Sequence, residues 1–260
     1  MIDLNQIRPD GHRARIGVIA PQTNTTNEVE FNRLAMALEK GGVTCHFTRT
    51  PLHSHAADDD FGDMLADIER AMDDLRAFSA SVSVFGCTSD SMACPADLLI
   101  GTMQKGHNVP AVSNAGAILS SLEVLGVKRL AMATPYTEAT NTHEASFLER
   151  HGYEVVHKAG LGLNTDMERI KLMSRVLPKE VFAHAKAADR PEAEAILICC
   201  TDFNNIDVIA PLEAELGKPV VSSNSVTFWA ALRALGLDDT IAGYGRLLEG
   251  NYILPATTIS

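Results

Sequence analysis

Short runs of apolar residues recur along the chain, separated by stretches in which apolar residues return every three or four positions. The short runs predict β-strands, and those that are apolar throughout predict strands buried on both faces, as in a parallel sheet. In the first half of the chain they are residues 16–20, 43–47, 82–85 and 109–112. In the second half they are residues 130–133, 153–156, 195–198 and 219–221. The pattern therefore predicts four strands twice over.

The stretches between these runs have the period of amphipathic helices. The clearest is residues 63–78, where apolar side chains return at spacings of three or four and acidic side chains fall largely on the other side. Strands that alternate with helices are typical of an α/β fold with parallel sheets. A chain of 260 residues is long enough for one large domain or two small ones.

The two halves of the chain also resemble each other in sequence. Residues 21–27 align with residues 135–141, sharing a proline, two threonines and an asparagine. Residues 109–114 resemble residues 218–224, and each of these segments continues into a helix that ends in a Leu-Gly pair. Strand-turn-helix units can be similar by composition alone, but several matches in the same order favour a duplication. Equivalent loops at the carboxyl ends of the strands should then face each other across one cleft.

A pair of cysteines completes the repeat. Cys87 and Thr88 follow one predicted strand, and Cys200 and Thr201 follow its equivalent in the second half. Either cysteine alone would more simply be a buried packing residue, since free cysteines are among the most buried residues. Their equivalence favours a shared role in the cleft. At such a strand end, the backbone N–H groups of the next helix would lower the thiol pKa and favour the thiolate.

The other three cysteines are expected to be structural. Cys199 precedes Cys200, so strand alternation would point its side chain to the opposite face. Cys45 and Cys94 have no partner in the repeat. Five cysteines, an odd number in a chain without a predicted export signal, favour free thiols over a disulfide framework.

Composition argues against several classes of partner. The chain has 22 Lys and Arg against 33 Asp and Glu, a net charge of −11, and no basic patch, so nucleic acid and anionic membranes would repel it. Residues 1–15 are polar and lack the apolar stretch of a signal peptide, and no run approaches the roughly 18 apolar residues of a membrane span. We therefore expect no nucleic-acid or membrane partner and a cytoplasmic protein.

Polar residues in the paired loops are candidates for ligand binding. Asn24 and Thr25 lie in the turn 21–27, whose backbone N–H groups open a helix and would bind a carboxylate. Capping of that helix is the alternative, and one residue can do both. Tyr136 takes the place of Gln22 in the second half, so a phenol would be directed into the cleft from the other side.

No metal or nucleotide site is expected. His53 and His55 have no acidic or sulfur partner at convincing metal-ligand spacing, so we interpret them as solvated loop residues. The sequence contains no glycine-rich phosphate loop and no dinucleotide-binding fingerprint.

Together these motifs resemble the maleate isomerase and arylmalonate decarboxylase branch of the aspartate/glutamate racemase superfamily. The resemblance implies two pseudo-symmetric flavodoxin-like α/β domains, each a four-stranded, mostly parallel sheet flanked by helices, with the active site in the cleft between them. It also implies that no cofactor is needed and that the protein is a homodimer. The segments that carry the resemblance are 21–26, 86–89, 134–136, 200–201 and 219–224. The implied domains are residues 1–116 with 226–260, and residues 117–225.

Carried over position by position, the resemblance implies that Cys87 and Cys200 are the catalytic pair. It also implies that Asn24, Tyr136 and Asn164 hold substrate carboxylates. Other residues of the same motifs are expected to complete the binding site for a small carboxylate: Thr25, Thr88, Ser89 and Thr201.

Three positions bear on which activity of this branch the chain is expected to have. The decarboxylases resemble one another in having a glycine at the position of Cys87, so a cysteine there disfavours decarboxylation. Asp90 and Asp202 depart from the family pattern. Facing the cleft, they would repel a dicarboxylate and raise the pKa of the neighbouring thiols.

The activity implied is cis-trans isomerisation of maleate or a maleate-like diacid. The Cys87 thiolate would add to one alkene carbon and Cys200 would protonate the other, with roles assigned by resemblance. An amino-acid or hydantoin racemase that uses the two cysteines as an acid/base pair is the enzymatic alternative, and a role in ectoine utilisation is related. A binding module for small carboxylates, with ordinary thiols, is the alternative outside enzymes.

Overall fold

The computed structural model describes residues 10–53 and 60–255. Within them the chain forms two four-stranded sheets in which all neighbouring strands are parallel. The first, ordered β2-β1-β3-β4, contains β1 (Ala14–Pro21), β2 (Val43–Thr50), β3 (Val82–Phe85) and β4 (Ala111–Ser113). The second, ordered β6-β5-β7-β8, contains β5 (Arg129–Thr134), β6 (Glu154–Gly160), β7 (Ala195–Ile198) and β8 (Val220–Ser222). The prediction of four strands twice over is confirmed, and the matching strand order is what a duplication would produce.

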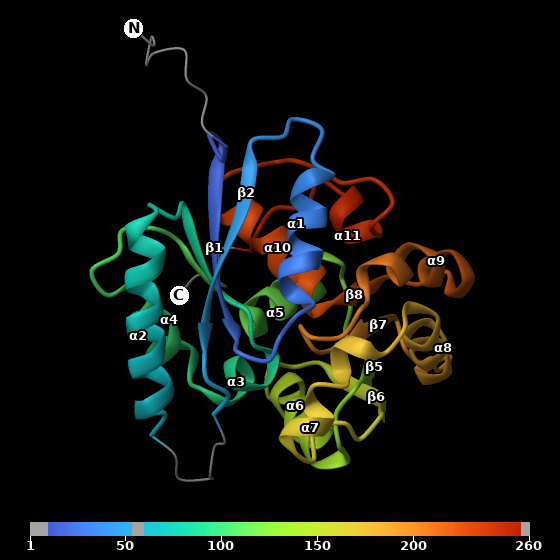
Figure 1. Cartoon of the computed structure of the whole chain (residues 1–260). Coiled ribbons are helices and arrows are strands. Elements are labelled where there is room, and N and C mark those ends of the chain that lie inside the picture. Colours follow the sequence, from blue (N-terminus) through green and yellow to red (C-terminus); the bar gives the residue numbers. More distant parts are fainter. Residues whose placement is uncertain (1–9, 54–59, 256–260) are drawn as a thin grey trace, which may run out of the picture.

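Helices cover both faces of each sheet (Figure 1). The outer face of the first sheet carries α2 (Gly62–Ala77) and α4 (Ala96–Gln104). The outer face of the second carries α8 (Pro178–Ala188) and α9 (Ile206–Leu216). Between the sheets lie α1 (Asn27–Met36), α5 (Asn114–Val124), α6 (Glu138–Arg150) and α10 (Ser223–Ala234). Short helices complete the chain: α3 (Thr88–Ala93), α7 (Met167–Ile170), the 3-10 turn η2 (Met173–Arg175) and α11 (Arg246–Glu249).

Three buried clusters correspond to these layers. The largest lies between the sheets and takes inward side chains from both, including Val18 of β1 and Leu197 of β7. Phe228 and Trp229 of α10 are fully buried in this cluster. Truncating an aromatic side chain at such a site to alanine typically costs about 3–5 kcal/mol of stability. The central cluster therefore fixes how the two sheets sit relative to each other.

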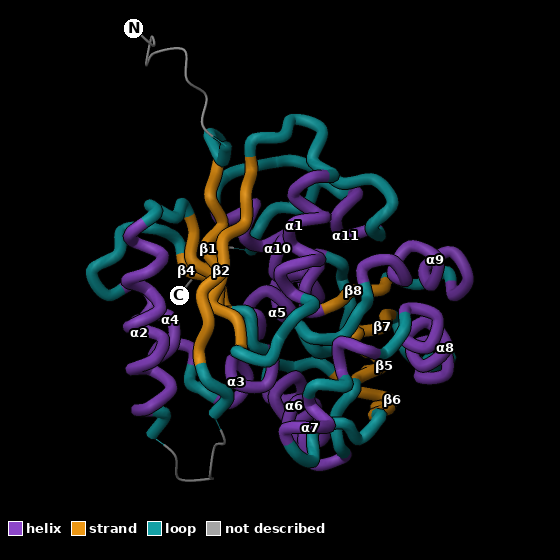
Figure 2. Tube along the Cα trace, in the orientation of Figure 1, coloured by secondary structure: helices purple, strands orange, loops and turns teal. Residues whose placement is uncertain are grey.

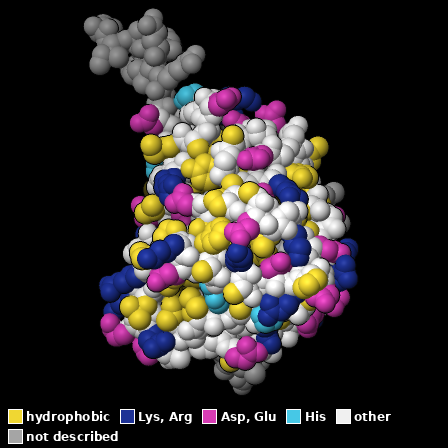
Figure 3. Space-filling model, turned by 90° about the vertical axis from the view of Figure 1, so that its right-hand side faces the viewer, with side chains coloured by type: hydrophobic (Ala, Val, Ile, Leu, Met, Phe, Trp, Pro, Cys, Tyr) yellow, Lys and Arg dark blue, Asp and Glu magenta, His cyan; other side chains and the backbone are white. Residues whose placement is uncertain are grey.

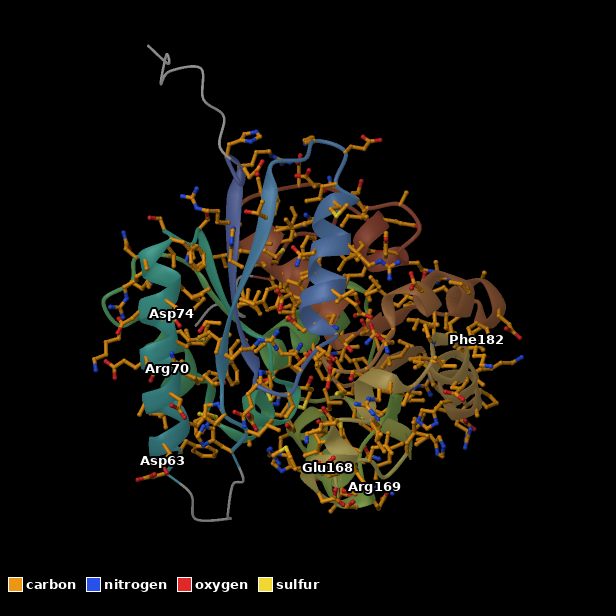
Figure 4. All side chains as sticks on the ribbon, viewed as in Figure 1. Asp63, Arg70, Asp74, Glu168, Arg169 and Phe182 are labelled. Carbon is orange, nitrogen blue, oxygen red and sulfur yellow. The ribbon has the colours of Figure 1, made fainter. Side chains whose placement is uncertain are left out.

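The helix predicted at residues 63–78 is α2. Its buried side chains follow the helical period and pack against β1 and β2, as with Ile68 and Leu75. Asp63, Arg70 and Asp74 lie on the outer side of the helix (Figure 4). Arg70 and Asp74 form an exposed ion pair one turn apart, which adds only about 0.3–0.5 kcal/mol. Burial of the apolar side therefore holds this helix in place.

One helix crosses between the two sheets. α10 follows β8 of the second sheet, yet it packs along α5 and contacts β3 and β4 of the first. The domain boundaries at residues 116 and 226 stay predictions. Within the described ranges, no helix combines the length and the apolar character needed to cross a membrane. On the face drawn in Figure 3, acidic and basic side chains are interspersed.

The carboxyl ends of the strands set the position of the functional loops. The segments after β1, β3, β5, β6 and β7 carry the predicted site residues. Figure 2 shows the loops after β1 and β2 running toward α3, close to α6 and α7. This is the place where open α/β sheets bind ligands.

Candidate active site

A cavity of about 260 Å³ lies where the loops after β1, β2, β3, β5, β6 and β7 meet. All but one of the residues predicted for the site line it: Asn24, Cys87, Thr88, Ser89, Tyr136, Asn164, Cys200 and Thr201. Thr25 is the exception, because its side chain is exposed outside the cavity. The two sheets thus contribute matching loops to one cavity.

Cys87 enters the cavity at the start of α3. Its backbone is extended, with φ −126° and ψ 121°, and it occupies the N-cap position of the helix. Its Sγ atom lies 3.8 Å from Ser89 Oγ. Burial and the nearby Asp90 carboxylate, to which the thiol is hydrogen-bonded, raise the Cys87 pKa well above its ordinary value. The predicted lowering of this pKa is wrong, because the single turn of helix is outweighed by desolvation and by a negative neighbour.

Cys200 faces the same cavity from the second sheet. Its φ of 137° is a conformation that residues with a side chain rarely adopt. Its N–H donates to Ser223 Oγ at 3.0 Å, and its Sγ accepts from the Asp202 N–H at 3.3 Å. Burial and the Asp202 charge raise the pKa of the Cys200 thiol, although the hydrogen bond from Tyr136 opposes them. The thiol is neutral at physiological pH and is suited to donating a proton.

Asn24 and Thr201 join the two halves of the protein at the cavity wall. Asn24 Nδ2 donates to Thr201 Oγ1 at 2.9 Å, and Thr201 Oγ1 donates to the Gly86 carbonyl at 2.9 Å. Asn24 Oδ1 also accepts from the N–H groups of Thr26 and Asn27, so the Asn24 side chain caps the start of α1. Asn24 therefore combines the capping role with a place in the cavity wall, and the two interpretations of this turn are compatible.

A second link between the halves lies behind the cysteines. Thr88 Oγ1 donates to Ser223 Oγ at 2.9 Å, and the same oxygen accepts the Cys200 N–H. Ser223 opens α10, so one hydroxyl connects the loop after β3 with the loop after β7. The loops that carry Cys87 and Cys200 are thereby held in a fixed relationship.

Side chains of the protein accept from the N–H groups at the predicted carboxylate-binding turn, residues 21–27, and at the equivalent turn before α6. Asp202 Oδ1 accepts from the N–H groups of Thr25 and Thr26, before α1. At the equivalent place before α6, Asn164 Oδ1 accepts from the Thr137 N–H at 2.6 Å. Oxygens of the chain itself thus bind at both helix starts, and the binding of a substrate carboxylate at the turn 21–27 stays a prediction.

Tyr136 reaches its position through an unusually close approach of two segments. A side chain on Gly160, at the end of β6, would collide with the Tyr136 carbonyl and with Asn141 Nδ2. Only glycine leaves room for the loop after β5 to lie so close to β6. Burial and the neighbouring thiol raise the Tyr136 pKa well above its ordinary value, so the phenol stays protonated and can act as a donor.

Sequence reasoning missed several residues of the cavity wall. His53 lines the cavity, is half-buried and lies with Nε2 3.1 Å from Asp67 Oδ2, so its interpretation as a solvated loop residue is wrong. Its position just beyond the carboxyl end of β2 was the available signal. His55 lies outside the described residues. Three apolar residues after β6 also line the cavity: Met167, Ile170 and Met173.

The remaining cysteines lie apart from this cavity. Cys199 is fully buried in the central cluster, whereas Cys200 belongs to the outer one, so the predicted alternation of their side chains is confirmed. Cys45 and Cys94 do not line the cavity, and all five thiols are free.

The cavity wall is acidic. Asp90 and Asp202 both line it, and within the described part of the chain no lysine or arginine does. Across residues 10–53 and 60–255, no group of three His, Cys, Asp or Glu side chains is arranged to hold a metal ion. A carboxylate substrate would therefore be bound by hydrogen-bond donors rather than by a lysine or arginine.

The chain is similar in sequence to proteins of known activity. A sequence profile of the arylmalonate decarboxylase family matches residues 46–248. The chain is similar to the maleate isomerase of Alcaligenes faecalis, with 26% identity over 249 residues, covering 91% of this chain and 96% of that protein. It is also similar to the arylmalonate decarboxylase of Bordetella bronchiseptica, with 32% identity over 148 residues, covering 56% and 61%.

A solved structure shares the fold over almost the whole chain. It is a cysteine-to-alanine variant of the maleate isomerase of Pseudomonas putida S16, determined with maleate. The TM-score is 0.82 at 25% identity, and the match covers 92% of this chain and 99% of that one.

Proposed function

The chain belongs to the arylmalonate decarboxylase family, and on that premise we propose that it is a cofactor-independent, two-cysteine isomerase of maleate or a maleate-like diacid. The observation that carries the proposal is the meeting of Cys87 and Cys200 in one cavity, on equivalent loops of opposite sheets. Several relatives matched along nearly their whole length are maleate isomerases. A cysteine at position 87 disfavours the decarboxylase reaction.

Cys87 is the proposed nucleophile. Its thiol is hydrogen-bonded to Asp90, and this carboxylate can take the proton when a substrate enters. The thiolate then adds to one alkene carbon, and the electron pair of the double bond moves toward the carboxylate on the adjacent carbon. The resulting enediolate-like charge is stabilised by N–H groups at the start of α3, which have no partners within the helix.

Cys200 is the proposed acid and base. It protonates the carbon next to the new C–S bond, so that the former double bond becomes a single bond that can rotate. Tyr136 donates to Cys200 and lowers the barrier by stabilising the thiolate that proton transfer leaves behind. After rotation Cys200 takes the proton back, the C–S bond breaks, the trans alkene forms, and Asp90 returns its proton to Cys87.

The test is direct product analysis. Maleate is incubated with the protein in water and in deuterium oxide and followed by proton NMR, with Cys87→Ala and Cys200→Ala variants as controls. We expect fumarate from the wild type only. Aspartate, glutamate and a hydantoin are incubated separately in deuterium oxide. Deuterium entering one of them, with no fumarate from maleate, would show racemase chemistry instead. Alkylation of both thiols at the rate of a model thiol, with no turnover of any substrate, would favour a binding module.

The protein is further proposed to be a homodimer and to reside in the cytoplasm. A homodimer, as the family resemblance implies, predicts twice the monomer mass of 28.0 kDa by light scattering. Residence in the cytoplasm predicts co-fractionation with cytoplasmic marker enzymes.

A further inference from the structure

One end of the cavity is already occupied by a carboxylate of the protein. Asp202 Oδ1 accepts from the Thr25 N–H at 2.9 Å and from the Thr26 N–H at 3.1 Å. These groups lead into α1, a helix of ten residues whose N-terminus favours negative charge. Only 6% of Asp202 is exposed, and the residue lines the cavity. Asp202 therefore sits where a substrate carboxylate was expected.

The second oxygen of this carboxylate is poorly paired. Asp202 Oδ2 is buried, and among the described residues no donor meets it at full hydrogen-bond geometry. The Thr26 hydroxyl is near enough to favour the ionised carboxylate. A ligand N–H or O–H would add a donor to this carboxylate, whereas a ligand carboxylate brings acceptors only and a second negative charge.

The surrounding charges strengthen this preference. Asp90 lines the cavity with Asp202, and the Cys200 thiol on the same loop is neutral. Arg49 of β2 is close enough to favour the ionised form of Asp202, but its guanidinium does not line the cavity and is bound to Glu28. No lysine or arginine on the described cavity wall therefore offsets a second ligand carboxylate at this end.

The opposite cradle differs in charge. There Asn164 Oδ1 accepts from the Thr137 N–H, and Asn164 Nδ2 donates to Thr140 Oγ1 at 2.7 Å. The amide is neutral, and among the described residues no cavity-lining carboxylate accepts from the N–H groups before α6. The two equivalent helix starts therefore differ: a carboxylate binds before α1 and a neutral amide binds before α6.

We propose that Asp202 is a specificity-determining residue that makes the end of the cavity next to α1 select a neutral hydrogen-bond donor, such as a carboxamide, over a second carboxylate. The preferred substrate class is then a short cis-alkene with one carboxylate and one carboxamide, of which the half-amide of maleic acid is the simplest. This inference deepens the proposed function and rests on it for turnover, though not for binding.

The test compares maleate with its half-amide at pH 8, where burial has raised the Asp202 pKa only to about 6 and the carboxylate is ionised. For the wild type we expect kcat/KM to be about tenfold higher for the half-amide than for maleate. Asp202→Asn keeps an oxygen for Thr25 and Thr26 but removes the charge and adds donors. We expect it to raise kcat/KM for maleate about tenfold, to lower it for the half-amide, and so to reverse the preference.

A matched control removes the same charge elsewhere. Asp207 is exposed on α9 and pairs with Arg33 outside the cavity, so Asp207→Asn should leave the ratio of the two kcat/KM values unchanged. Circular dichroism of each variant verifies the fold. A wild type that prefers maleate, together with an Asp202→Asn variant that isomerises maleate more slowly, would overturn the assignment of Asp202 and leave the isomerase function intact.

Binding separates the two proposals. Calorimetric titration with succinate and with its half-amide, saturated analogues that cannot isomerise, measures the preference without turnover. Tighter binding of the half-amide by the wild type, reversed in Asp202→Asn, supports the role of Asp202 even if neither alkene is isomerised, in which case only the isomerase function fails. Equal binding of the two analogues by both proteins overturns the specificity role.

Discussion

Glu144 stands at the position of the repeat equivalent to Glu30, yet only Glu30 is hydrogen-bonded to backbone and amide donors. Glu30 Oε1 accepts from the N–H groups of Asn205 and Ile206, and Oε2 accepts from Asn224 Nδ2. Neither oxygen of Glu144 has such a partner among the described residues, and the side chain is fully buried. The same residue of the repeat thus links the two halves in one case, and in the other is a buried carboxyl group with the Cys199 thiol as its partner.

Replacing Glu144 with glutamine is expected to stabilise the protein above neutral pH. Burial raises the pKa of Glu144 to about 8, with only the Cys199 thiol in opposition. In the unfolded chain the pKa is ordinary, so between about pH 4.5 and 8 the folded state binds more protons, and its stability falls as the pH rises. Glu144→Gln removes this loss, with a gain of roughly 3 kcal/mol at pH 8.5 and little at pH 5.

The measurement is urea denaturation at both pH values. Glu30→Gln is the control, because its new NH₂ group would face donors and should destabilise the protein by about 1–3 kcal/mol. A Glu144→Gln variant with the wild-type stability at pH 8.5 would show that Glu144 is solvated or paired in solution.

Replacing either cysteine is expected to stop the reaction, but at a different step for each. Cys87→Ala removes the nucleophile and should reduce kcat about 10³-fold or more, with no covalent species. Cys200→Ala keeps the nucleophile but lacks the proton donor, so addition to maleate can occur without efficient release. Intact-mass spectrometry of this variant should show the protein with one added maleate. An adduct that instead forms in Cys87→Ala would reverse the assigned roles.

Tyr136→Phe is expected to lower kcat more than it raises KM. The phenol donates to the Cys200 thiolate that forms when the proton is transferred, and this contact is stronger in the transition state than in the resting protein. A loss of about 10²-fold in kcat follows, measured by steady-state kinetics. An effect confined to KM would mean that the phenol binds the ground state of the substrate and does not assist Cys200.

The fold followed from local patterns in the sequence. The unbroken apolar run at residues 195–198, and the run at 82–85 that only Ser83 interrupts, became central strands with the predicted bounds, because strands buried on both faces are mostly apolar. The weaker runs gave shifted ends, as in β6, which continues to Gly160 beyond the predicted residue 156. That edge strand is half-exposed and contains polar residues, so its full length leaves no apolar run in the sequence.

The site was only partly open to prediction. The repeat brought Cys87 and Cys200 together because equivalent loops of a duplicated fold face each other. Their raised pKa values depend on burial and on where the Asp90 and Asp202 side chains point, which the spacing along the chain does not contain. His53 was missed because the loop after β2 shares no sequence motif with its counterpart after β6, although both loops line the cavity.

The backbone at Cys200 is expected to be strained, and glycine at this position should relieve the strain. Its φ of 137° lies where only glycine is unstrained, and such strain costs of the order of 1–3 kcal/mol. Cys200→Gly and Cys200→Ala both remove the thiol, but only glycine relieves the backbone, so Cys200→Gly should be the more stable by about 1 kcal/mol or more. At Cys87 the backbone is extended, with φ −126°, and the order should reverse, because glycine there only adds freedom to the unfolded chain. Thermal unfolding of the four variants measures both differences. A Cys200→Gly variant less stable than Cys200→Ala would mean that the loop after β7 is relaxed in solution, and that the position of the thiol is set by Ser223 and Asp202 without backbone strain.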